Sequence, residues 1–81
     1  MIISGAKQLF EAVKQTAAGL EELGMKDDAD RLRAALSIST LPGEILGEIR
    51  LALLRIDIKA LPKKIEDEIA RERSYIDEVL G

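Results

Sequence analysis

The segment from Glu44 to Leu61 most constrains the fold, because it is apolar on two opposite sides when it is read as a helix. At about 100° per residue, one side carries Ile45, Ile49, Ala52, Leu53, Ile56 and Ala60. The opposite side carries Leu51, Leu54, Ile58 and Leu61. A helix on the surface of a small monomer needs only one apolar stripe. The second side therefore predicts either a helix sandwiched by its own chain or a surface that binds another protein.

Three further amphipathic helices are predicted around this segment. Apolar residues recur at spacings of three and four over residues 4–23, and Gly24 follows where a left-handed residue would end the helix. A second stripe over residues 26–37 comes after a short turn, which favours an antiparallel hairpin. The last helix, 62–80, opens at Pro62, which disfavours helical angles in the residue before it. We therefore expect a break and an antiparallel return there, with one long kinked rod as the alternative.

Residues 55–59 alternate apolar and polar side chains, which is also the pattern of a strand. No other stretch of the sequence offers a strand to pair with, and a lone strand is unstable, so we predict helix. The expected fold class is all-α, with a single domain over residues 1–81. It is a compact bundle of four helices at about 4–23, 26–37, 41–59 and 62–80, with dimerisation left open.

The side chains that most catalytic and metal sites require are missing. The sequence contains no His and no Cys, which removes the commonest general base and the usual zinc ligands. The serines fall at helix ends, in a loop or on a charged helix, and the glycines are too scattered to form a phosphate-binding loop. We therefore predict a protein that is not an enzyme, with no catalytic residues, no metal and no cofactor.

Glu72 falls on the apolar stripe of the last helix, between Ile69 and Ile76. Because an unpaired carboxylate in an apolar contact is costly, Glu72 must be paired, lie at a rim or face a cation of a partner. We favour an exposed rim, with a polar residue that sets the register of a helical interface as the alternative. Glu72 and Glu68 could also share a site or a cation, although a solvated face is the interpretation we favour. The candidate arginine partners are Arg50, Arg55, Arg71 and Arg73.

The charge pattern does not resemble a nucleic-acid footprint. The net charge is -3 and both signs are interspersed, whereas phosphate binding needs a basic patch. A helix-turn-helix would direct Glu44 and Glu48 towards phosphates. No apolar run approaches the length of a membrane span, the start of the sequence lacks the features of a signal peptide, and the absence of Cys fits the cytoplasm. We expect a cytoplasmic protein that binds neither nucleic acid nor membrane.

The expected function is contact between proteins. An exposed second apolar side would forfeit about 1.5–3 kcal/mol for each large side chain, which is enough to drive association. We predict a non-enzymatic protein–protein interaction module that forms a homodimer or docks on another protein, such as a small inhibitor or adaptor. The alternatives are a small DNA-binding regulator and an engineered helical bundle without a partner. The predicted partner-binding residues are Leu51, Leu54, Ile58, Leu61 and Glu72.

Overall fold

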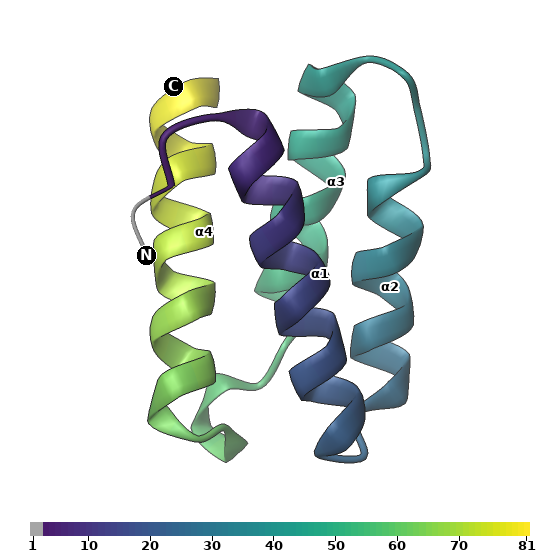
Figure 1. Cartoon of the computed structure of the whole chain (residues 1–81), viewed down its shortest axis with the longest axis vertical. Helices are drawn as coiled ribbons and strands as arrows, with labels where there is room; N and C mark the ends of the chain where they lie inside the picture. Colours follow the sequence, from purple (N-terminus) through teal and green to yellow (C-terminus); the bar gives the residue numbers. More distant parts are fainter. Residues whose placement is uncertain (1–2) are drawn as a thin grey trace.

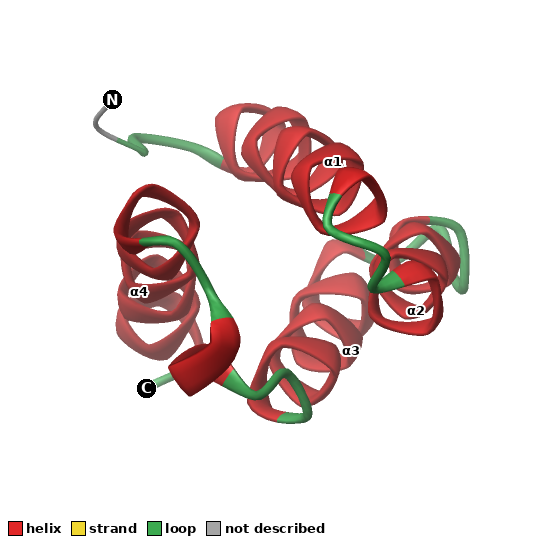
Figure 2. Cartoon of the chain, turned by 90° about the horizontal axis from the view of Figure 1, so that it is seen from below, coloured by secondary structure: helices red, strands yellow, loops and turns green. Residues whose placement is uncertain are grey.

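The computed structural model describes residues 3–81 and forms a four-helix bundle in which successive helices run up and down (Figure 1). Seen along the bundle, each helix lies beside the one before it, and α4 closes the ring against α1 (Figure 2). The predicted all-α fold class is confirmed, with no strand among the described residues. The elements are α1 (Ala6–Glu22), α2 (Lys26–Leu36), α3 (Pro42–Leu54), the short 3-10 helix η1 (Ile58–Ala60) and α4 (Lys63–Leu80).

The core fills the middle of this ring with aliphatic side chains. Each helix contributes one apolar stripe, as amphipathic helices in a small bundle do. The side of α3 that the sequence assigns to the core is buried, except for Ala60, which lies beyond the helix. The buried apolar residues of the helices are Leu9, Val13, Ala17, Leu20, Ala29, Leu32, Ala35, Ile45, Leu46, Ile49, Ala52, Leu53, Ile69 and Ile76.

The turn between α1 and α2 ends α1 as its sequence predicts. Gly24 has a φ of 82°, a left-handed conformation that glycine adopts without a steric penalty. The N–H of Met25 donates to the carbonyl of Leu20 at 2.9 Å, and the N–H of Gly24 donates to that of Glu21 at 3.0 Å. These two bonds are those of a Schellman motif and satisfy carbonyls at the end of α1. The turn returns α2 antiparallel to α1.

The connection between α3 and α4 differs from the prediction. Helix α3 ends at Leu54 rather than near residue 59, and Asp57 caps η1 by accepting a bond from the N–H of Lys59 at 3.1 Å. An aspartate that bonds the nearby backbone in this way competes with helix continuation. Pro62 then stands at the N-cap of α4 with extended backbone angles. The expected break and antiparallel return are confirmed, but the chain leaves the helix well before the proline.

Candidate functional site

Only part of the second apolar side predicted for α3 is exposed on this helix in the structure. Leu51 and Leu54 are 56% and 51% exposed, and helical spacing places them together on the pole of α3 opposite its core stripe. Ile58 and Leu61 lie beyond the end of α3, so they do not extend this helical surface. Ile58 is 39% exposed on η1, whereas Leu61 is buried against the core. Leu61 is only 9% exposed and belongs to the core, so it offers little surface for the partner contact predicted from the sequence.

Ile38, in the loop between α2 and α3, extends the exposed apolar surface of α3. It lines two shallow hollows together with Leu51 and Glu48, of about 210 and 350 Å³. We call Ile38, Gly47, Leu51 and Leu54 the outer patch. Charges of both signs border it, with Arg31 and Arg55 on one hollow and Glu44 on the other.

Glu48 and Arg55 border the outer patch without ion-pair partners. Within residues 3–81, neither side chain takes part in a salt bridge. The other arginine on this helix, Arg50, points to the opposite flank and contacts Asp77 of α4 at 3.3 Å. The outer patch is therefore an apolar strip beside an acid and a base that the fold itself does not use.

Glu72 is the second unusual residue, and the rim position that we favoured for it is wrong. Its side chain is only 1% exposed, and one carboxyl oxygen, Oε2, accepts a hydrogen bond from Thr16 Oγ1 of α1 at 2.7 Å. The other oxygen, Oε1, is buried without a partner in the described chain. No arginine forms an ion pair with it among these residues. The partner is the hydroxyl of Thr16, which sequence reasoning missed.

A signal for this contact was present in the sequence. Thr16 lies on the α1 stripe with Val13 and Ala17, and Glu72 lies on the α4 stripe with Ile69 and Ile76. Each is a polar residue on an otherwise apolar face, and a buried polar group requires a partner. The sequence thus marked both residues as needing a partner, although it did not show that α1 and α4 meet.

The environment of Glu72 changes its acidity. Burial raises the pKa of this carboxyl from 4.5 to about 7, and the charge of Glu68 adds to the rise. The hydrogen bond from Thr16 and the charge of Arg71 lower the pKa, but by less than burial raises it. An acid of this kind changes its charge near neutral pH.

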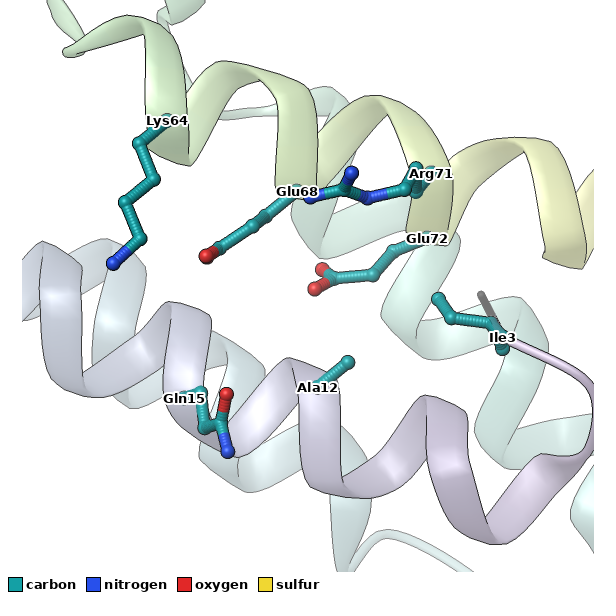
Figure 3. A pocket seen from close by; sticks show the side chains of 7 residues that line it. All are labelled: Ile3, Ala12, Gln15, Lys64, Glu68, Arg71 and Glu72. Atoms are coloured by element: carbon teal, nitrogen blue, oxygen red, sulfur yellow. The ribbon is translucent and has the colours of Figure 1, made fainter. Parts of the chain in front are cut away.

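Glu72 forms part of a cleft of about 240 Å³ between α1 and α4. In Figure 3, the side chains of Glu68 and Glu72 reach from α4 towards α1, where Ala12 and Gln15 face them. The Thr16 hydroxyl is fully buried, so it is not placed to attack a substrate. The lining residues are Ile3, Ala12, Gln15, Lys64, Glu68, Arg71 and Glu72.

Comparison with protein-family models, with curated proteins and with solved structures finds no match to this chain. Among residues 3–81, no group of three or more His, Cys, Asp or Glu side chains is placed to hold a metal ion. None of the helices in this part of the chain is long and apolar enough to cross a membrane. The two candidate functional features are therefore the outer patch and the α1–α4 cleft.

Proposed function

We propose that this protein is a non-enzymatic interaction module that self-associates through the outer patch. The observation that carries the proposal is the exposure of Leu51 and Leu54, both more than half exposed although α3 already buries a full stripe on its opposite side. Single exposed leucines are common, but adjacent ones rimmed by polar residues mark contact surfaces. The acids Glu44 and Glu48 beside the outer patch disfavour phosphate, and with it a DNA-binding role.

A second copy of the chain suits this surface because the charges beside it are self-complementary. Glu48 and Arg55 lie seven residues apart, so they share one flank of the strip formed by Leu51 and Leu54. If two α3 helices pack antiparallel about a two-fold axis near these leucines, Glu48 of each copy faces Arg55 of the other. The interface would thus contain two ion pairs made from side chains that have no such partner within residues 3–81.

The size of the outer patch supports a weak dimer. Burying the exposed half of Ile38, Leu51 and Leu54 is worth about 0.7–1.5 kcal/mol for each side chain. Counted on both copies, the apolar gain is roughly 4–9 kcal/mol before the cost of association, which is about 4–15 kcal/mol. Since micromolar affinity corresponds to about 8 kcal/mol net, we expect a reversible dimer weaker than micromolar.

Sedimentation equilibrium over a range of protein concentrations tests this function. The native chain should show a monomer–dimer equilibrium, and Leu54→Lys should remain monomeric with unchanged helicity by circular dichroism. The matched control is Val79→Lys, which replaces an equally exposed apolar residue on α4 and should dimerise like the native chain. A native chain that stays monomeric at millimolar concentration contradicts the proposal, as does unfolding of Leu54→Lys.

Charge reversal tests whether the occupant is a second copy in the antiparallel register. Glu48→Arg and Arg55→Glu should each weaken the dimer by placing like charges opposite each other. The double variant should recover native affinity, because both pairs are then restored with reversed sign. Independent, additive losses in the double variant would exclude this register while leaving the leucine result intact.

A further inference from the structure

The α1–α4 cleft contains an unsatisfied hydrogen-bonding atom. Glu72 Oε1 has no partner among the described residues, whereas Oε2 is bonded to Thr16. A buried polar atom without a partner is costly, and more so when it carries charge. Among the described residues, Oε1 is therefore free to accept a hydrogen bond from a donor that enters the cleft.

The cleft is large enough for a small organic molecule. Its volume of about 240 Å³ is several times the roughly 30 Å³ that one water occupies in the liquid. Figure 3 shows the carboxyl group of Glu72 beside the side chains of Glu68 and Arg71, which project from the same helix, α4. Long side chains at a surface change rotamer on the picosecond to nanosecond timescale. Rotation of these two side chains would admit a donor to the buried oxygen.

The charged residues of the cleft indicate what kind of molecule fits. Glu68 and Glu72 are one helical turn apart on α4, and their carboxyl groups extend into the same space (Figure 3). A primary ammonium carries three donors and can bond both carboxylates. Lys64 and Arg71 also line the cleft, so a bare cation would meet two positive charges. A molecule that carries one ammonium and one carboxylate complements both kinds of residue.

We propose that the α1–α4 cleft binds a small amino-acid-like zwitterion, whose ammonium donates to Glu72 Oε1 and to Glu68 and whose carboxylate faces Lys64 and Arg71. The apolar wall formed by Ala12 and Ile3 contacts the carbon chain between these groups. This function is separate from self-association, because the outer patch lies on α3 and in the loop before it.

Binding of the zwitterion should depend on pH, because it is linked to the ionisation of Glu72. The ammonium requires Glu72 in its ionised form, but burial raises the pKa of that carboxyl to about 7. The affinity should fall about tenfold for each pH unit below this pKa and level off above it. The other groups near Glu72 are Glu68, Arg71 and Lys64 of α4. The residues that α1 presents to the cleft are uncharged, and Arg50 of α3 is paired with Asp77.

The test titrates the native chain with 4-aminobutanoate and follows the amide signals of Ala12, Thr16 and Glu72 by NMR. We expect saturable shifts at these residues at pH 8, with about tenfold weaker binding at pH 6. Butanoate, which lacks the ammonium, should not bind, and n-butylammonium, which lacks the carboxylate, should bind more weakly. Absence of saturable shifts, or equal binding of butanoate, would overturn the proposal. Equal binding of n-butylammonium would overturn the role of Lys64 and Arg71.

Two variants test whether Glu72 is responsible for the binding and for its pH dependence. Glu72→Gln keeps a neutral group that can accept from Thr16, so it should fold while losing binding by about tenfold or more and losing the pH dependence. The matched control is Glu66→Gln, an exposed acid of α4 that does not line the cleft, and it should bind like the native chain. Native-like binding by Glu72→Gln would contradict the assignment. Dimerisation of either variant reports separately on the outer patch, because that surface does not include α4.

Discussion

The α1–α4 cleft and the outer patch of α3 are unusual in opposite ways. The cleft buries a charged residue, whereas the outer patch exposes apolar ones. In the α1–α4 cleft, Glu72 is buried between Ile69 and Ile76. On α3, Leu54 is exposed directly after the buried Leu53. The free-energy cost of the carboxyl arises inside one chain and depends on pH. The cost of the exposed leucines is relieved only by contact from outside and therefore depends on protein concentration. Each surface thus responds to a different variable.

The largest expected effect contrasts two adjacent leucines of α3. Leu53→Ala removes a side chain that is 1% exposed and should lower the free energy of unfolding by about 2–5 kcal/mol, because it leaves a cavity. Leu54→Ala should change it by less than about 0.5 kcal/mol in the monomer. Urea denaturation at low protein concentration measures both. An equal loss for the two variants would place Leu54 in the core and remove the basis for the outer patch.

The next effect concerns Glu72 and pH. Its pKa is about 7 in the fold and 4.5 ordinarily, so the native state binds more protons than the unfolded state between these values. Stability is then full below pH 4.5 and is lost as the pH rises through 7, by about 3 kcal/mol in total at 1.36 kcal/mol for each pH unit. Urea denaturation from pH 4 to pH 9 measures this loss.

Replacement of Glu72 isolates its contribution to that profile. Glu72→Gln should remove the loss of stability between pH 4.5 and 7, since the amide does not titrate, and should make the protein more stable than the native chain at pH 8. Glu66→Gln, at an exposed position, should leave the loss in place. If the native chain and Glu72→Gln lose stability in parallel as the pH rises, the carboxyl of Glu72 is solvated. The contrast between a buried charge in the α1–α4 cleft and exposed leucines in the outer patch would then be wrong.

Local features of the sequence predicted most of the fold. The apolar spacings identified all four helices, and Gly24 marked the end of α1 because only the local backbone decides that turn. The stripe Ile45, Ile49 and Leu53 was correctly assigned to the core. The end of α3 was not predicted, since Ile56 and Ile58 continue the helical spacing past Leu54. The chain instead leaves the helix at Leu54, and Asp57 caps the short helix η1 that follows; the spacing of apolar residues does not reveal such a cap.

The candidate site was harder to predict because it depends on distant residues. Thr16 and Glu72 are 56 residues apart in sequence, and their contact exists only once α4 has closed the ring against α1. Single-helix patterns place each residue on a face but do not say which faces meet. For the same reason Leu61 looked available to a partner, although the turn before α4 carries it into the core. Leu51 and Leu54 were predictable because α3 alone determines which pole they occupy.

The smallest expected effect concerns Gly47 of the outer patch, where one substitution should change the stability of the monomer and the affinity of the dimer in opposite directions. A methyl group added at Gly47 meets no atom within 4 Å, and alanine is favoured over glycine inside a helix by about 0.5–1 kcal/mol. Gly47→Ala should therefore raise the melting temperature of the monomer. In the antiparallel dimer, Gly47 lies near the end of α3 of the other copy, so the same methyl should weaken association in sedimentation equilibrium. Gly19→Ala provides the contrast, since its added carbon would lie 3.2 Å from Ile65 Cδ1 and should affect stability without altering the dimer. If Gly47→Ala stabilises the monomer and leaves association unchanged, the two α3 helices do not approach each other at this residue, and the antiparallel register is wrong even though the leucines are exposed.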